Sequence, residues 1–171
     1  MGTSDYIFLA VVIIFLLSQT LFKDRSPIPE TSHKVHKITS SAELDALLSS
    51  TDNVVVDFYA DWCPPCRTIA PIFSGLADSY GTQGRLGFAK VNVTHLNELA
   101  GRYQVSAMPT FVFFEKGVPK GIDVGDRIKG SRVSVSRGAD GLVERVRGAD
   151  KGALEAVVQA LAAAHGISKK E

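Results

Sequence analysis

The sequence predicts an α/β domain in which helices cover both faces of one sheet, because strand patterns and helix patterns alternate along the chain. The central prediction is a buried strand over residues 54–60, where three valines precede aromatic residues. A helix follows over residues 65–80, since Ile69, Phe73 and Leu76 recur at helical spacing. The other predicted elements are, in chain order, an edge strand over 35–39, a helix ending near 48, a strand over 85–93, a helix over 96–103, a strand over 110–115 and a last helix that begins after Asp150.

Two of these helices carry start signals. Ser40 and Glu43 have the spacing of a capping box, in which each side chain accepts a hydrogen bond from a free backbone N–H group at the helix start. Asp150 can cap the last helix, and Gly166 provides a stop for it. These signals support the predicted helix boundaries.

The composition indicates one ordinary globular domain with a short extension, since the chain has 171 residues of which 45% are hydrophobic. A formal net charge of +1 and the absence of a long run of Lys or Arg argue against binding to nucleic acid. The chain contains two cysteines, which excludes the framework of several disulfides that holds together many small secreted proteins.

Both cysteines, Cys63 and Cys66, directly follow the predicted central strand and lie where the next helix begins. At a helix N-terminus, unpaired backbone N–H groups and the helix dipole favour negative charge, which stabilises a thiolate relative to a thiol. Cys66 lies one helical turn after Cys63, so it can attack a mixed disulfide formed there. The spacing therefore indicates a dithiol redox site.

Further residues accompany the cysteines in a familiar order along the chain. They are Asp57, Pro71, Lys90, Met108, Pro109, Thr110 and Gly148. Together with the two cysteines they resemble the thioredoxin family, roughly over residues 34–165 with an interruption near 117–140. The resemblance implies a thioredoxin fold with a mixed five-stranded sheet. It also implies an enzyme that reduces protein disulfides by dithiol-disulfide exchange.

The resemblance also implies roles for single residues. Cys63 would attack the substrate disulfide, Cys66 would resolve the mixed disulfide, and Asp57 with its companion Lys90 would assist proton movement at Cys66. Burial of Asp57 among valines disfavours its ionised form, which suits it to accept a proton near neutral pH. The residues implied to bind substrate are Trp62, Pro64, Pro65, Met108, Pro109 and Thr110, with Pro109 in the cis form.

No bound cofactor is implied; NADPH would supply electrons indirectly, through a thioredoxin reductase. Pro64 and Pro65 stand where thioredoxins usually carry Gly and Pro, so the redox potential is left open. The alternatives are a disulfide oxidase or isomerase of the secretory pathway, and a binding module that uses the thioredoxin surface without catalysis. A zinc site or a purely structural disulfide is less favoured, since the four histidines are scattered and the loop between the cysteines is short.

The N-terminal segment predicts a membrane anchor over residues 1–22, because residues 6–22 carry no charge and reach the short end of a membrane span. An extended linker is expected over 23–33 and the thioredoxin domain over 34–168. Basic residues follow the apolar run, so the positive-inside rule would leave the domain in the cytosol. A cleaved signal sequence is the alternative, and it would direct the domain to the secretory pathway.

The connection over residues 117–140 is longer than a minimal member of the thioredoxin family needs for one hairpin. It is rich in glycine and carries several basic residues. We expect a longer hairpin or a partly disordered loop, as is common for long connections in compact domains. A docking surface for a partner protein is the alternative.

Overall fold

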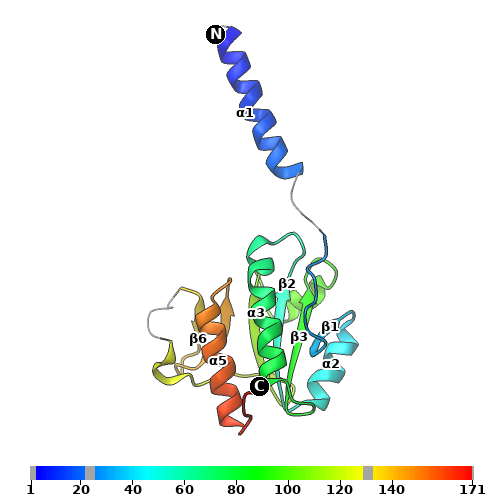
Figure 1. Cartoon of the computed structure of the whole chain (residues 1–171), viewed down its shortest axis with the longest axis vertical. Coiled ribbons are helices and arrows are strands. Elements are labelled where there is room, and N and C mark those ends of the chain that lie inside the picture. Colours follow the sequence, from blue (N-terminus) through cyan, green and yellow to red (C-terminus); the bar gives the residue numbers. More distant parts are fainter. Residues whose placement is uncertain (1–2, 22–25, 129–132, 171) are drawn as a thin grey trace.

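A computed structural model describes residues 3–21, 26–128 and 133–170 of the chain (Figure 1). The helices are α1 (Thr3–Leu21), α2 (Ser41–Ser50), α3 (Pro64–Tyr80), α4 (Asn97–Arg102) and α5 (Lys151–Ala164), with a short 3₁₀ helix over Gly125–Arg127. The strands are β1 (Val35–Ile38), β2 (Asn53–Tyr59), β3 (Leu86–Asn92), β4 (Thr110–Glu115), β5 (Val118–Pro119), β6 (Val135–Arg137) and β7 (Val143–Arg147). Each element predicted from the sequence is present, with boundaries that differ by one or two residues.

One mixed sheet forms the centre of the domain. Its strand order is β1-β3-β2-β4-β7-β6, and β5 pairs with β4. The strands β1, β3 and β2 run parallel, whereas β4, β7 and β6 pair antiparallel. The sheet has seven strands rather than the predicted five, because the long connection after β4 contributes β5 and β6.

Two apolar layers hold helices on opposite faces of this sheet, as predicted. On one face α3 and α5 lie side by side and pack, through side chains such as Phe73 and Leu154, against strand residues that include Phe111. On the other face α2 and α4 contribute Leu44 and Leu99 to a second layer. The sequence alternates strands and helices because each helix must bury its apolar stripe against the sheet.

The predicted helix starts are confirmed. Ser40 Oγ accepts a hydrogen bond of 3.2 Å from the backbone N–H of Glu43, and the Glu43 carboxylate accepts one of 2.7 Å from the backbone N–H of Thr39. The Glu43 side chain thus bonds to the backbone of Thr39, one residue before the N-cap Ser40. Asp150 Oδ1 accepts from the backbone N–H of Ala153 at 2.9 Å and caps α5.

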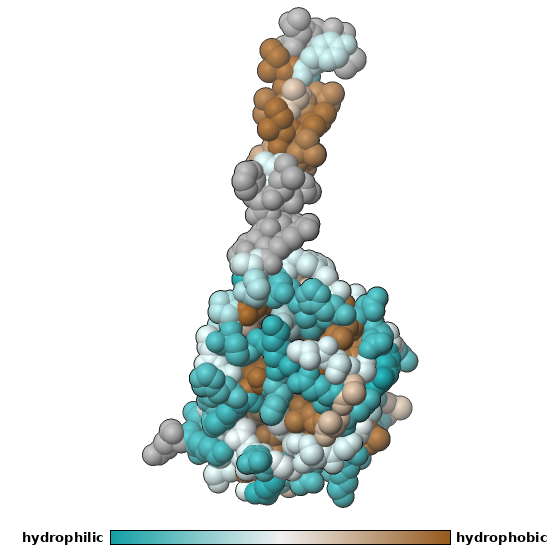
Figure 2. All heavy atoms as spheres, turned by 90° about the vertical axis from the view of Figure 1, so that its right-hand side faces the viewer, coloured by the Kyte–Doolittle hydropathy of each residue, from teal (hydrophilic) through white to brown (hydrophobic). Residues whose placement is uncertain are grey.

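The N-terminal segment forms α1, a helix of 19 residues, which confirms the predicted hydrophobic helix. Its aliphatic and phenylalanine side chains are exposed from Ile7 to Leu17, and Figure 2 shows a brown surface beyond the domain. No helix in the described part of the chain is long and apolar enough to cross a membrane, so the predicted anchor over residues 1–22 is not supported.

Residues 26–33, which the sequence places in an extended linker, lie against the domain, and we call this segment the strap. Ile28 and Ser32 within the strap are buried. The backbone N–H of Ile28 donates to Asp61 Oδ1 at 3.0 Å, and Ser32 Oγ bonds to Asp78 Oδ1 at 2.6 Å. The remainder of the predicted linker, residues 23–25, lies outside the described residues.

The long connection after β4 contributes to the apolar core. Ile122 and Val124 are buried in the layer beneath α3 and α5, and Ile122 forms an isolated antiparallel bridge with Val143. Residues 129–132 within the connection lie outside the described residues. The described part therefore includes core side chains and the edge strand β6, in addition to surface loop.

Candidate active site

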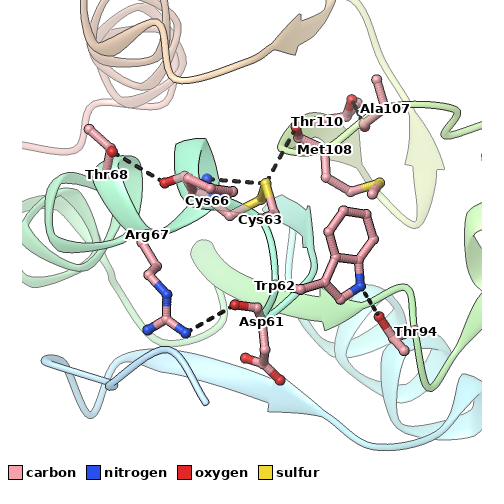
Figure 3. The surroundings of a disulfide bond; sticks show 11 residues. Asp61, Trp62, Cys63, Cys66, Arg67, Thr68, Thr94, Ala107, Met108 and Thr110 are labelled. Atoms are coloured by element: carbon pink, nitrogen blue, oxygen red, sulfur yellow. Dashed lines mark hydrogen bonds between the residues drawn. A yellow bond between two sulfur atoms is a disulfide. The ribbon is translucent and has the colours of Figure 1, made fainter. Parts of the chain in front are cut away.

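The two cysteines form a disulfide where β2 gives way to α3 (Figure 3). Cys63 is the N-cap residue of α3, and its sulfur accepts a hydrogen bond of 3.3 Å from the backbone N–H of Cys66. Pro64 and Pro65 fill the first two helical positions, where the missing N–H groups would have no helical partner. The helix start thus holds both sulfurs together and directs a backbone N–H group at Cys63.

The N-terminal end of α3 favours negative charge on Cys63. Backbone N–H groups in the first helical turn lack helical acceptors, and the helix dipole places partial positive charge at this end. When the disulfide is reduced, the N–H of Cys66 can donate to a Cys63 thiolate in the same way as it donates to the sulfur in the disulfide. The geometry therefore suits Cys63 to act as a nucleophile.

A small cavity of about 10 Å³ lies beneath Cys66, which is about the room that one water molecule needs. Asp57 of β2 and Lys90 of β3 border this cavity and are paired in register on adjacent strands. Asp57 is 4% exposed, and its Oδ1 atom has no hydrogen-bond partner among the described residues. The structure thus brings a buried, unsatisfied carboxyl group next to the second cysteine.

Asp57 is a weaker acid in the folded chain than in water. Burial raises the pKa of Asp57 from 3.8 to about 7, although the Lys90 ammonium group opposes this and the Glu30 carboxylate adds to it. Burial also raises the pKa of Tyr59 to about 12, and the charges of Asp61 and Asp57 act in the same direction. Tyr59 therefore stays neutral while Asp57 changes its charge near neutral pH.

Lys90 forms its ion pair with Glu30 of the strap. Its Nζ atom also lies 5.7 Å from the centroid of the Tyr59 ring, a cation–π contact. Ser74 Oγ of α3 donates to Glu30 Oε1 at 2.9 Å. Burial raises the pKa of Glu30, but hydrogen bonds from Lys90 and Ser74 more than offset this, so its pKa lies below its usual value.

The loop before β4 faces the disulfide. The Met108–Pro109 peptide bond is cis, which confirms the predicted isomer, and the Met108 carbonyl oxygen lies 3.6 Å from Cys63 Sγ. Thr110 is buried, and its hydroxyl donates to the carbonyl oxygen of Ala107 at 2.8 Å. The Thr110 side chain therefore supports the loop, and Met108 is the partly exposed residue beside the sulfur.

The predicted substrate-binding side chains of the redox turn lie at the surface. Trp62 is 41% exposed, and its Nε1–H donates to Thr94 Oγ1 at 3.2 Å, which fixes the indole ring beside the disulfide (Figure 3). Pro64 and Pro65 are exposed as well. The disulfide is thus bordered by a flat, largely apolar rim.

Sequence reasoning missed two acidic residues that hold the site. Asp61 accepts hydrogen bonds from the backbone N–H of Ile28 and from Asn92 Nδ2, while its own carbonyl oxygen accepts from Arg67. Glu30 pairs with Lys90. Asp61 could have been noticed because it stands beside Trp62, whereas nothing in the local pattern around Glu30 distinguishes it from a solvated linker residue.

Comparisons with known proteins show to which family the chain is similar. The family model described as "Thioredoxin" matches residues 34–134. A thioredoxin-like protein of Fusarium culmorum is 50% identical over 97 residues, which cover 57% of this chain and 80% of that protein. A thioredoxin of Neurospora crassa is 43% identical over 108 residues, covering 63% and 85% of the two chains.

Solved structures give the same result. The crystal structure of a Malassezia sympodialis thioredoxin matches with a TM-score of 0.57 and 30% identity, and the match covers 75% of this chain and 94% of that one. A Schistosoma mansoni thioredoxin matches with a TM-score of 0.54 and 32% identity, and the match covers 74% of this chain and 94% of that one.

Among the described residues, no group of His, Cys, Asp or Glu side chains could hold a metal ion.

Proposed function

Because the chain belongs to the thioredoxin family, we propose that Cys63 attacks protein disulfides, that Cys66 resolves the mixed disulfide, and that Asp57 takes the proton from Cys66. The chain is a thiol-disulfide oxidoreductase of the thioredoxin type, with Cys63 and Cys66 as its redox pair. The assignment of these roles rests on the position of Cys66, which borders the same cavity as the buried Asp57.

In the first step the Cys63 thiolate attacks one sulfur of a substrate disulfide. A bond forms between Cys63 and that sulfur, the substrate disulfide breaks, and the second substrate sulfur leaves as a thiolate that takes a proton from water. The N–H of Cys66 and the N-terminus of α3 stabilise the attacking thiolate. This step needs Cys63, which is the cysteine next to the exposed Trp62 and Met108 rim.

In the second step Cys66 attacks Cys63, which forms the disulfide seen in the structure and releases, as a thiolate, the substrate sulfur that was bonded to Cys63. The two electrons of the Cys63–Cys66 dithiol have then passed to the substrate. Cys66 must lose its proton before or during this attack. An ionised Asp57 accepts it, directly or through one water molecule in the cavity, since its pKa of about 7 matches the working pH.

The rim around the disulfide supports a role in binding extended substrate segments. Trp62, Pro64 and Pro65 supply exposed, largely apolar surface beside the disulfide, and the partly exposed Met108 adds to it. Pro109 keeps the Met108 carbonyl oxygen beside Cys63, where backbone groups of a substrate could bond to the loop. Thr110 contributes by holding this loop through its bond to Ala107.

Each catalytic cycle leaves the pair oxidised, so a reductant must restore the dithiol. We propose a thioredoxin reductase that draws on NADPH. The test is NADPH oxidation by the full chain together with a thioredoxin reductase and a disulfide-bonded protein. The wild type should consume NADPH in proportion to substrate thiols formed, whereas Cys63→Ser should show no turnover.

The variant Cys66→Ser tests the order of attack. It should accumulate a mixed disulfide between Cys63 and the substrate protein, visible on a non-reducing gel and released by dithiothreitol. A mixed disulfide that forms instead in Cys63→Ser, through Cys66, would contradict the assigned roles.

A further inference from the structure

The strap, residues 26–33, precedes the part of the chain that the thioredoxin family model matches, yet it forms part of the redox site. Ile28 is buried in a cluster with Tyr59, Cys63 and Cys66. Ile28, Pro29 and Glu30 also border the cavity that holds Asp57. A segment outside the matched domain therefore closes the cavity in which Cys66 would lose its proton.

Several contacts anchor the strap at this place. The backbone N–H of Ile28 donates to Asp61 Oδ1 at 3.0 Å, and Ser32 Oγ bonds to Asp78 Oδ1 at 2.6 Å. Arg67 donates to the carbonyl oxygen of Ser26. Since these bonds lie on both sides of Glu30, they fix its carboxylate at the edge of the cavity.

Lys90 pairs with Glu30 rather than with Asp57. The Lys90 ammonium group is paired with the Glu30 carboxylate, whereas Asp57 Oδ1 has no hydrogen-bond partner among the described residues. The Glu30 charge also acts on Asp57 in the direction that favours its protonated form, opposite to the action of Lys90. The charged and titratable groups that act on Asp57 or border its cavity are Lys90 of β3, Glu30 of the strap, Tyr59 of β2 and Cys66 of α3. The charge of Asp61, in the redox turn, acts on Tyr59.

We propose that Glu30 is a positioning residue of the redox site, which holds the Lys90 ammonium group and thereby controls when Asp57 can accept the proton of Cys66. This inference rests on the proposed role of Asp57 as proton acceptor. Glu30 does not touch the reacting sulfurs; it acts through Lys90 and through its own charge. It makes the strap a functional part of the enzyme.

The variant Glu30→Gln tests the proposal, because it keeps the size of the side chain and removes its charge. Carboxyl carbon NMR of the oxidised full chain follows the titration of Asp57 directly. We expect the midpoint of this titration to move toward acid by about one pH unit, as is typical of losing a nearby like charge. Glu155→Gln is the matched control, since Glu155 also pairs with a lysine, Lys151, but lies on α5.

A kinetic readout follows the same change. With 5,5′-dithiobis(2-nitrobenzoate), attack by Cys63 releases one coloured thiolate and attack by Cys66 on the resulting mixed disulfide releases the second. Lowering the midpoint from about 7 to about 6 raises the ionised fraction of Asp57 at pH 6 about fivefold. The second phase should therefore be about fivefold faster at pH 6 in Glu30→Gln. Glu30→Asp, which keeps the charge, should restore the wild-type profile.

A loosened strap could also change Asp57, by letting water into the cavity. Exchange of the Ile28 amide reports whether the strap stays in place, because this amide donates to Asp61. Ile28→Ala loosens the strap without a change of charge and serves as the comparison. A larger shift in Glu30→Gln than in Ile28→Ala supports the proposal, whereas equal shifts, or an unchanged Asp57 midpoint in Glu30→Gln, overturn it.

The two readouts separate this inference from the proposed function. A shifted Asp57 titration with an unshifted second kinetic phase would leave the action of Glu30 intact and would reject Asp57 as the proton acceptor. An unshifted titration would reject the role of Glu30, whatever the kinetics show.

Discussion

Replacing the buried carboxyl group by Asp57→Asn should change how the stability of the protein depends on pH. Asp57 ionises at about 7 in the folded chain and near 3.8 when exposed in the unfolded chain. Between these values the folded state binds a proton that the unfolded state has lost. The free energy of unfolding of the wild type therefore falls as pH rises from about 4 to about 7.

The magnitude follows from the difference between the two pKa values. Each pKa unit corresponds to about 1.4 kcal/mol, so the full loss approaches about 4 kcal/mol. Between pH 5 and pH 8.5 the wild type should lose about 3 kcal/mol through Asp57. In Asp57→Asn this contribution disappears, and the variant becomes relatively more stable at alkaline pH.

The assay is urea unfolding of the oxidised full chain at several pH values, followed by circular dichroism. The quantity to compare is the variant's free energy of unfolding minus that of the wild type, at pH 8.5 and at pH 5. Any pH-independent effect of the asparagine amide cancels in this difference. Asp45→Asn, at an exposed carboxylate paired with Arg102, is the control and should change the difference by less than about 0.5 kcal/mol.

Parallel curves for the wild type and Asp57→Asn would refute this reasoning. They would mean that Asp57 has the same pKa in the folded and unfolded chains. Burial would then not disfavour the ionised form of this carboxyl group, and the main argument for Asp57 as proton acceptor would fail.

Three further predictions concern other parts of the molecule. Val124→Ala should lower the free energy of unfolding by about 2 kcal/mol in urea titrations, because Val124, in the long connection after β4, is fully buried. An unchanged free energy of unfolding would mean that the connection does not belong to the core. Ser40→Ala should cost about 1 kcal/mol by removal of the cap of α2, and Ser49→Ala, on an exposed site in the same helix, should have a smaller effect in the same titrations. Lys90→Gln should raise the pKa of Asp57, so the pH profile of the second kinetic phase should move toward alkali; an acid shift would contradict the assigned sign.

The redox site could be predicted from the sequence because its parts are local. The central strand, the two cysteines and the start of α3 are contiguous, and strand and helix patterns differ sharply at Cys63. Asp57 and Lys90 were predicted through the resemblance to the thioredoxin family, and register pairing of β2 with β3 brings them together. Burial of Asp57 was expected from the valines before it and is observed.

The strap could not be predicted, because its contacts are distant in sequence. Glu30 lies between a proline and hydroxyl residues, in a segment without hydrophobic periodicity, and its partner Lys90 lies on β3. Ile28 is the one buried apolar residue of the strap, and a single apolar residue gives no pattern. Only the tertiary structure shows that this segment closes the cavity.

The sequence predicted the connection after β4 only in part, and the membrane anchor predicted at the N-terminus is not supported. Glycines and basic residues in the connection concealed the short strand β6, whose three residues are too few to give a clear alternation. The helix expected from the apolar N-terminal residues is present as α1, whereas no helix in the described part of the chain is long and apolar enough to cross a membrane.

The midpoint potential of the Cys63–Cys66 couple tests the assignment as a reductase most directly. The full chain would be equilibrated with glutathione and dithiothreitol buffers, and the fraction of disulfide measured after thiol trapping. A value of about −270 mV, which is typical of thioredoxins, is expected for a pair that donates electrons to protein disulfides. A value between about −180 and about −120 mV, typical of disulfide isomerases and oxidases, would contradict the account.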